Sequence, residues 1–456
     1  MDTKKLRQKI LDLAIHGKLV PQDPNDEPAS VLLERIKVEK EQLIKEGKIK
    51  RSRKSAKTSD TPHYEQVKLE VPNSWYMVSV SDLFLLNPKS ELDDNMKVGF
   101  IPMALVEDGF SGNHFYEERT WKDVKRGYCH FQNGDIGIAK ISPCFENRKS
   151  TIFKNLPNTY GAGTTELVIL RPIKVYTKFY LYLFKSDWYV KEGTKYFKGV
   201  VGQQRVHKEI FTDLHIPLPP FAEQQRIVEE IEYWFALIDQ IEQDKSDLQT
   251  AIRQTKSKIL DLAIHGKLVL QNPNDEPASE LLKRINPKAE ITCDNGHYPQ
   301  LPDGWVVVPM QMLCSLTDGE KLDGKEMPNL DVKYLRGERD FKTQTNGRYV
   351  AANSLLILVD GENSGEVFRT PIEGYQGSTF KQLHINENML AEYILHVINL
   401  HRKALRENKV GSAIPHLDKK LFKAIEVPVP PYDEQVRIVT VINSMHSKLD
   451  AIMENL

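Results

Sequence analysis

Apolar residues recur at alternating steps of three and four between Phe221 and about His265 in this 456-residue chain. The spacing places them on one face of a helix and predicts a long amphipathic helix with a coiled-coil seam. Roughly 45 residues at about 1.5 Å each would make a rod about 68 Å long. Lys245 and Thr255 occupy two seam positions, and Gly266 suits the left-handed conformation that ends many helices. The predicted central seam consists of Ile227, Ile231, Trp234, Ile238, Ile241, Leu248, Ile252, Ile259 and Leu262.

Both ends of the chain carry parts of the same pattern. The N-terminal part repeats the last portion of the central helix up to Gly17, and the C-terminal part repeats its first portion. A lone seam would leave apolar side chains in water, so we predict that the terminal pieces form a second rod that pairs with the central one. This pairing would bring the chain ends near each other. The terminal seam positions are Leu6, Ile10, Leu13, Ile438, Ile442, Met445, Leu449 and Ile452.

A sequence repeat underlies this pattern. Residues 9–36 and 258–285 differ at four of 28 positions, the segment 216–228 (IPLPPFAEQQRIV) resembles 427–439 (VPVPPYDEQVRIV), and VPNSW at 71–75 resembles LPDGW at 301–305. The central block carries the two helical motifs without interruption, whereas the chain begins with one and ends with the other. The sequence therefore has the order of a circle cut open. Two amphipathic helices packed separately on their own domains are the alternative, but they do not explain this permuted order.

Two regions between the helices, roughly 64–215 and 297–427, contain short β-like runs broken by Gly, Pro and Asn. The predicted fold class is α+β, with two strand-rich mixed domains separated by long antiparallel coiled-coil-like helices in a pseudo-twofold circular arrangement. The predicted segments are 1–46 (N-terminal helical region, pairing with the C-terminal helix), 47–63 (basic linker), 64–217 (first strand-rich domain), 218–290 (central helical region), 291–428 (second strand-rich domain) and 429–456 (C-terminal helical region).

Composition excludes several classes of protein. The chain is too long for a single small domain, and its apolar runs, such as 355–359, are far too short to span a membrane. The four cysteines form no CxxC pair, so neither a zinc site nor a disulfide framework is expected. The first ten residues lack an apolar signal core, which favours a cytoplasmic protein. The net charge of −1 argues weakly against nucleic acid when it is taken as one total.

Catalytic motifs are missing from the sequence. No GxxxxGK[ST] loop, GxGxxG turn after a strand or HExxH helix occurs, so we expect no enzymatic activity, no metal and no cofactor in this chain. The strings LPPF (218–221) and VPPY (429–432) resemble the [DNS]PP[YFW] loop of amino-group DNA methyltransferases but lack its polar first residue, which accepts the hydrogen bonds of the target amino group. We therefore expect Pro-Pro to end a strand and begin a helix, with Glu223 and Glu434 favouring the positive helix end.

The arrangement of PPxxEQxRIV at each helix start and ILDLAIHGKLVPQDPNDEPA after it resembles the specificity subunit of type I restriction-modification systems over essentially the whole chain. The string AKISPCFENRK at 139–149 resembles a segment common in that family's target-recognition domains. The resemblance implies that each domain reads one half of a bipartite double-stranded DNA site. It also implies two methyltransferase subunits and two restriction (motor and nuclease) subunits as partners, and assigns SAM, ATP and Mg to those partners.

Charge divided by region agrees with DNA binding. Residues 65–120 sum to −6 and residues 121–213 to +8, while residues 401–423 carry seven positive and two negative charges. Basic surface therefore gathers late in each domain, on or near the loops 198–208 and 409–420. Lys48–Lys57, with six positive charges, is expected to be a solvated linker, or else to contact phosphates. The candidate DNA contacts are Lys140, Asn147, Arg148, Lys149, Lys198, Gln203, Gln204, Arg205, His207, Asn363, Ser364, Arg369, Lys381, Lys409, Ser412 and His416.

The predicted function is that of a non-enzymatic DNA-recognition subunit that reads an asymmetric two-part site. The unlike loop sequences QQRVH and SAIPH predict different half-sites. A coiled-coil scaffold or regulator that binds DNA or protein without methyltransferase partners is the alternative, and co-purification with a SAM-binding protein would separate the two. A free-standing adenine methyltransferase would require SAM binding by the isolated chain.

Overall fold

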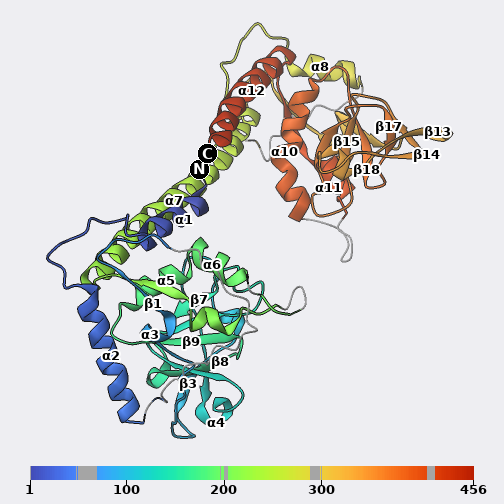
Figure 1. Ribbon diagram of the computed structural model, residues 1–456. Coiled ribbons are helices and arrows are strands. Elements are labelled where there is room, and N and C mark those ends of the chain that lie inside the picture. Colours follow the sequence, from blue (N-terminus) through green and yellow to red (C-terminus); the bar gives the residue numbers. More distant parts are fainter. Residues whose placement is uncertain are drawn as a thin grey trace. The chain divides into compact units, whose positions relative to one another are not determined.

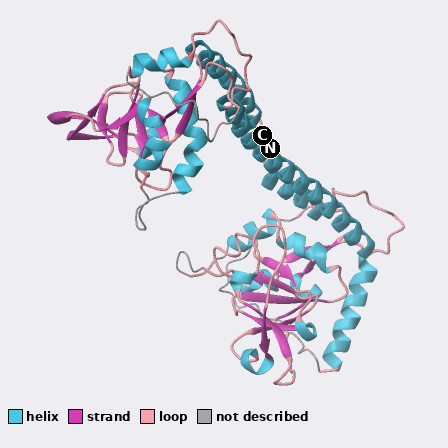
Figure 2. Ribbon diagram, turned by 180° about the vertical axis from the view of Figure 1, so that it is seen from behind, coloured by secondary structure: helices cyan, strands magenta, loops and turns pink. Residues whose placement is uncertain are grey.

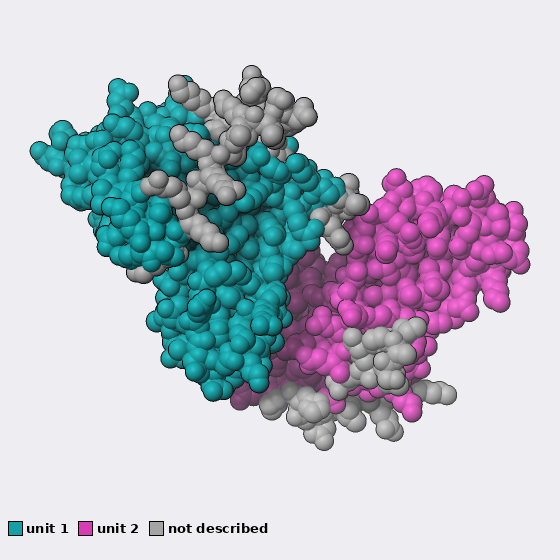
Figure 3. Space-filling view, turned by 60° about the horizontal axis from the view of Figure 1, so that its bottom comes forward, with its two compact units in different colours: residues 1–243 teal, residues 244–456 magenta. Residues whose placement is uncertain are grey.

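The computed structural model describes residues 2–47, 49, 69–195, 197–199, 204–287, 298, 300–407 and 416–456. It divides the chain into two compact units, residues 1–243 and 244–456 (Figure 3). The boundary falls inside one helix, α7 (Phe221–Ile264). Each unit has its own hydrophobic core and is described by itself.

Unit 1 places a strand-rich domain between two helical segments (Figure 1). The domain contains two four-stranded sheets, in the orders β2-β9-β6-β7 and β4-β3-β8-β5, while β1 pairs with β10 where the chain enters and leaves the domain. The elements are α1 (Thr3–Ile15), α2 (Ala29–Lys45), β1 (Tyr76–Ser79), α3 (Val80–Leu83), β2 (Phe84–Leu86), β3 (Lys97–Ile101), η1 (Met103–Leu105), β4 (Glu117–Thr120), α4 (Trp121–Val124), β5 (Cys129–Gln132), β6 (Ile136–Ala139), β7 (Ser150–Ile152), η2 (Pro157–Thr159), β8 (Tyr160–Gly163), β9 (Leu167–Pro172), α5 (Thr177–Phe184), α6 (Asp187–Thr194), η3 (Lys208–Phe211), β10 (His215–Leu218) and the first part of α7.

Helix α1 packs antiparallel to the first part of α7. The Arg7 guanidinium lies 2.6 Å from the Asp239 carboxylate, while residues beyond the end of α1 contact the start of α7. Arg7 also lies over the Phe235 ring, with its central carbon 5.0 Å from the ring centroid. The buried side chains of α1, α2, α5 and α7 join those of β1, β6 and β9 in one core, so the helices and the strand-rich domain of this unit are a single folded body.

Unit 2 has the same order of parts, and its sheet β12-β18-β15-β16 has the strand order of β2-β9-β6-β7 in unit 1. The second sheet differs, because β13, β14 and β17 close into a small barrel. One long strand, β14, pairs with β13 at its start and with β17 at its end, where unit 1 uses the separate strands β4 and β5. The elements are the second part of α7, α8 (Ala278–Ile285), β11 (Val306–Pro309), η4 (Met310–Met312), β12 (Cys314–Thr317), β13 (Lys321–Leu330), α9 (Val332–Leu335), β14 (Lys342–Val350), β15 (Leu355–Leu358), β16 (Val367–Arg369), β17 (Gly374–Gln376), β18 (Phe380–Ile385), α10 (Ala391–Glu407), α11 (Lys419–Ala424), β19 (Glu426–Val429) and α12 (Tyr432–Glu454).

Helix α12 lies along the second part of α7 in unit 2 (Figures 1 and 2). Lys256 pairs with Asp450, and Lys245, at a predicted seam position, donates to the backbone oxygen of Leu456. The repeat aligns Lys256 with Arg7 and Asp450 with Asp239, so the same cross-helix ion pair occurs in both units.

The α+β class, the two strand-rich regions and the long central helix are confirmed. The Pro-Pro motifs do separate a strand from a helix, since β10 ends at Leu218 before α7 and β19 ends at Val429 before α12. Among the described residues, no helix is long and apolar enough to cross a membrane. The division into six segments and the pairing of the chain ends stay predictions.

The buried face of the helices differs from the predicted seam at several positions. Exposed side chains are found at Leu6, Trp234, Ile241, Leu248, Met445 and Ile452, whereas Ile10, Ile227, Ile231, Ile238, Ile252, Ile259, Ile438 and Ile442 are buried, and Leu13, Leu262 and Leu449 are half-buried. Phe235, next to Trp234, is buried against Phe110 and Tyr182 of the strand-rich domain. The first part of α7 packs against this domain as well as against α1. Its buried face is therefore wider than the face of an ideal heptad and is shifted towards the domain.

Candidate nucleic-acid interface

The structure joins two predicted loop segments of unit 1. The Ile141 and Arg205 backbones form a β-bridge, Ser142 N–H donates to the Gln204 carbonyl at 2.8 Å, and Val206 N–H donates to the Lys140 carbonyl at 2.8 Å. The segment 139–149 and the described part of the loop 198–208 therefore form one surface. Lys198 is exposed on this surface, and Gln204 is half-buried.

Arg205 makes an ion pair within this surface. Its Nε and Nη2 atoms donate to the Glu166 carboxylate at 2.7–3.2 Å, and this hydrogen bonding lowers the pKa of Glu166. The guanidinium fork is thus held in the bidentate geometry that also suits guanine. Contact of Arg205 with a base would require exchange of the Glu166 carboxylate for the base edge.

Two other candidates in this segment face the protein. Arg148 pairs with Asp187 and donates to the Lys185 carbonyl at 3.1 Å, and its side chain is 12% exposed. Lys149 Nζ donates to the Val106 carbonyl at 2.9 Å. In this structure both side chains therefore bind groups of the protein itself, and their contact with DNA stays a prediction.

Beside Arg148 lies a buried lysine, Lys185, that the sequence did not indicate. Lys185 is fully buried, and its Nζ donates to the carbonyls of Gly109 and Arg148 at 2.8 and 3.0 Å. Burial lowers its pKa to about 7. No feature of the surrounding sequence FKSDWY distinguishes Lys185 from an exposed helix-end lysine, so nothing could have identified it.

Unit 2 joins the corresponding segments. His416 Nδ1 lies 2.6 Å from an oxygen of Asp360, and the following residue, Leu417, donates its N–H to the Val359 carbonyl at 2.7 Å. Asn363 is half-buried in this segment, but Ser364 is fully buried and its hydroxyl donates to the Gly361 carbonyl. The hydroxyl of Ser364 is therefore not available to a base edge in this conformation.

The remaining candidates are partly engaged. Arg369 donates to Glu392 at 3.1 Å, Lys381 donates to Asp318 at 2.5 Å, and His207 lies 3.5 Å from Glu209. Asn147 is half-buried. Gln203, Lys409, Ser412 and nearly all of the predicted basic linker 47–63 lie outside the described residues. The assignment of individual side chains to DNA stays a prediction.

Each unit also contains a buried polar junction built from the repeated motifs. The indole N–H of Trp75 donates to Glu223 at 2.9 Å, and that of Trp305 donates to Glu434 at 3.0 Å. Both carboxylates are 1% exposed, and burial raises the pKa of each. These glutamates were expected only to favour the helix N-terminus, but each also binds the tryptophan that directly precedes the first strand of its domain.

Further contacts of the junction recur at equivalent positions. Arg226 forms a two-pronged ion pair with Asp26 at 2.6 and 2.9 Å, and Arg437 pairs with Asp275 at 2.5 Å. The hydrogen bond from Arg226 lowers the pKa of Asp26.

The two glycines of the repeat close these junctions. Gly17 and Gly266 have φ of +64° and +65°, and a Cβ at either would lie 2.3–2.4 Å from the ring of Pro72 or Pro302. Both glycines therefore end their helices in the left-handed conformation, as predicted for Gly266, and both allow a close approach that a side chain would prevent.

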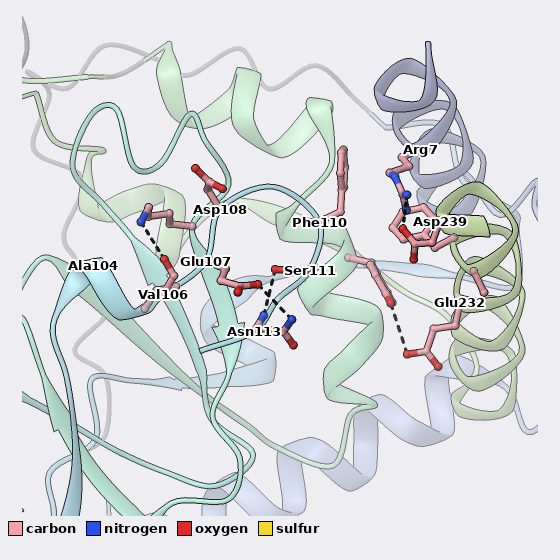
Figure 4. Close-up of a pocket in the computed structure, with 14 residues that line it drawn as sticks. Arg7, Ala104, Val106, Glu107, Asp108, Phe110, Ser111, Asn113, Glu232 and Asp239 are labelled. Atoms are coloured by element: carbon pink, nitrogen blue, oxygen red, sulfur yellow. Dashed lines mark hydrogen bonds and ion pairs between the residues drawn. The ribbon is translucent and has the colours of Figure 1, made fainter. Parts of the chain in front are cut away.

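A cleft of about 810 Å³ opens in unit 1 between the loop 104–113 and the helices α1 and α7 (Figure 4). Four carboxylates and two cations line it, and Asp239 is paired with Arg7. The excess of negative charge disfavours phosphate. No three His, Cys, Asp or Glu side chains among the described residues are grouped to hold a metal ion. The lining residues are Arg7, Ala104, Val106, Glu107, Asp108, Phe110, Ser111, Asn113, Lys149, Tyr182, Glu232, Phe235, Ala236 and Asp239.

Comparison with known sequences gives consistent matches. The family "Type I restriction modification DNA specificity domain" matches residues 72–250 and 302–456. The specificity subunit of the type I restriction enzyme EcoAI from Escherichia coli is 37% identical over 419 residues, which cover 79% of this chain and 70% of that protein. The corresponding subunit of EcoEI from the same species is 41% identical over 326 residues, covering 62% of this chain and 54% of that protein.

Solved structures agree in fold. A chain from a study of complex assembly and conformational transition of a type I R-M system superposes with a TM-score of 0.64 at 16% identity, covering 84% of this chain and 93% of the other. The HsdS subunit from Thermoanaerobacter tengcongensis gives a TM-score of 0.52 at 16% identity, covering 84% and 92%. At this identity the likeness is one of fold.

Proposed function

This chain belongs to the type I restriction-modification DNA specificity family, and on that premise we propose that it reads a bipartite, asymmetric DNA site with one half-site per strand-rich domain. In this proposal the chain is not an enzyme. It binds double-stranded DNA and directs two methyltransferase subunits for adenine methylation and two restriction subunits for cleavage. SAM, ATP and Mg belong to those partners, in keeping with the lack of their binding motifs in this sequence.

The observation that carries the proposal is a repeated junction that holds two unlike domains. The helical motifs 9–36 and 258–285 are identical at 24 of 28 positions, and both junctions contain the same tryptophan–glutamate and arginine–aspartate contacts. The domains between them differ in their second sheets and in their loop sequences. Recognition of an asymmetric site with two half-sites requires two different domains that are attached to the helices in the same way.

Methylome sequencing tests this function. Cells that express the chain with a methyltransferase subunit of the same family of systems should show methylated adenines within one two-part motif, with unlike halves separated by a fixed spacer. Cells with the methyltransferase alone are the control. Methylation without a motif, or with two identical halves, would contradict the proposal, and failure of a SAM-binding protein to co-purify would favour the scaffold alternative.

A further inference from the structure

The strands β13 and β14 of unit 2 form a ribbon that has no close counterpart in unit 1. Lys321–Asp323 pair with Asn346–Arg348, and Met327–Asn329 pair with Lys342–Gln344, with a bulge between the two sets. The strands have ten and nine residues, against five and four in the corresponding β3 and β4. Figures 1 and 2 both show this ribbon extending outward from the strand-rich domain of unit 2.

The ribbon is polar on both faces. Four of the five residues of β3 are buried, whereas none of the first six residues of β13, Lys321–Glu326, is buried. Successive side chains of a strand point to opposite faces, so Thr343 and Thr345 share one face of β14, and Gln344 and Asn346 share the other. All four are exposed or half-buried. Met327, Leu330 and Val350 are buried at the end near the domain, but the outer part of the ribbon is buried on neither face and does not contribute to the core.

These side chains also retain free hydrogen-bonding capacity. Within the described part of the chain, the side chains of Thr343, Gln344, Thr345 and Asn346 have no hydrogen-bond partner, and Lys321 and Lys342 form no ion pair. This distinguishes them from the earlier candidates Arg205, Arg369 and Lys381, which are paired with carboxylates.

We propose that this ribbon enters the major groove of duplex DNA with the face that carries Gln344 and Asn346, placing these two side chains at base edges and Lys321 and Lys342 at phosphates. The inference rests on the proposed function and adds a reading element to unit 2. The major groove is about 12 Å wide and admits a two-stranded ribbon, and asparagine binds the edge of adenine in bidentate fashion. The four residues 343–346, at about 3.3 Å each, span roughly 13 Å, which is the length of three to four base pairs.

The charge and composition of the ribbon fit DNA better than a protein partner. Residues 321–350 carry seven Lys and Arg against five Asp and Glu, while the corresponding residues 97–120 carry two against four. The centre of a protein interface is apolar and depleted of charge. In the outer part of the ribbon, away from Met327–Leu330, the structure describes one half-buried aliphatic side chain, that of Leu322.

The test uses the full chain in complex with its methyltransferase. The probe is a duplex carrying the motif that methylome sequencing recovers for the parent complex. The double variant Gln344→Ala/Asn346→Ala should bind this duplex about 10- to 100-fold more weakly, and its methylome should show relaxed bases in one half-site and an unchanged other half. Asn399→Ala, which changes an exposed asparagine on α10, is the matched control.

A second variant tests the phosphate contact separately. Lys342→Ala should weaken binding to all sequences alike and reduce the slope of log affinity against log salt by about one. Lys283→Ala, at a side chain that is 59% exposed on α8 and outside the basic stretch 401–423, is its control.

Unchanged affinity and an unchanged motif in the double variant, or an unchanged salt slope for Lys342→Ala, would overturn the ribbon proposal while the proposed function stands. A weakening in which the motif stays strict and DNA-free assembly with the methyltransferase is lost would overturn it in favour of a protein contact. A parent complex that shows no sequence-specific methylation would overturn the proposed function, and the ribbon proposal with it.

Discussion

Replacement of the buried Lys185 by methionine should change how the stability of unit 1 depends on pH. The Nζ atom of Lys185 is fully buried and donates to two carbonyls, those of Gly109 and Arg148. Burial lowers its pKa from 10.5 to about 7 in the folded chain. The unfolded chain therefore holds this proton between pH 7 and 10.5 and the folded chain does not, so stability rises as the pH rises through this window.

The magnitude follows from the two pKa values. Stability should rise by up to about 1.4 kcal/mol per pH unit within the window, which gives about 2.5 kcal/mol between pH 7.5 and pH 9.5. Lys185→Met removes this dependence but leaves both carbonyls without their donor, at a cost of about 1–3 kcal/mol each. The two proteins should therefore differ less in stability at pH 7.5 than at pH 9.5, where the parent is clearly the more stable.

Chemical unfolding followed by tryptophan fluorescence measures this difference, because four of the five tryptophans lie in unit 1. Lys122→Met, at an exposed lysine of α4, is the control and should keep the parent's pH dependence. Subtraction of the variant from the parent at each pH removes the contributions of all other titrating groups. A difference in the free energy of unfolding that stays constant between pH 7.5 and 9.5 would refute the assignment of a buried, shifted lysine.

Three further predictions concern the helices and their junctions. Gly17→Ala and Gly266→Ala should each destabilise their own unit by at least about 1–2 kcal/mol, since the new Cβ meets a proline ring in a backbone region costly for alanine; thermal unfolding checks this, and two unshifted transitions would contradict it. Trp75→Phe removes the donor to buried Glu223 and should cost about 2–4 kcal/mol, measured by denaturant titration; a loss below 0.5 kcal/mol would show that the bond is dispensable. Insertion of four residues in 245–254 lengthens α7 by about 6 Å and should add one or two base pairs to the spacer between the half-sites. An unchanged spacer in the methylome would contradict this prediction.

The helical part of the fold could be predicted because its signals are local in sequence. The steps of three and four that define α7 and the glycine after its end are legible without knowledge of any partner. The exact buried face could not be predicted, since Phe235 rather than Trp234 is buried by a domain distant in sequence.

The site was harder to predict for two physical reasons. Arg148 and Ser364 have the residue types and loop positions of DNA contacts, but tertiary hydrogen bonds and burial occupy them. The ribbon of β13 and β14 could not be predicted, because strands that are polar on both faces lack the alternation of apolar and polar residues that identifies a strand.

A short two-stranded sheet, β1 with β10 or β11 with β19, limits how each strand-rich domain can change. Tyr76 pairs with Leu218 and Val306 pairs with Val429, so the first and last strands of each domain are hydrogen-bonded neighbours. Strands paired in this way lie about 5 Å apart, whatever is inserted between them. A polypeptide that begins and ends on this spacing, and that also covers the helices as Phe110 and Tyr182 cover Phe235, can be accommodated. New sequence preferences could thus arise by exchange of a whole domain as readily as by point substitution, with the helical framework left intact.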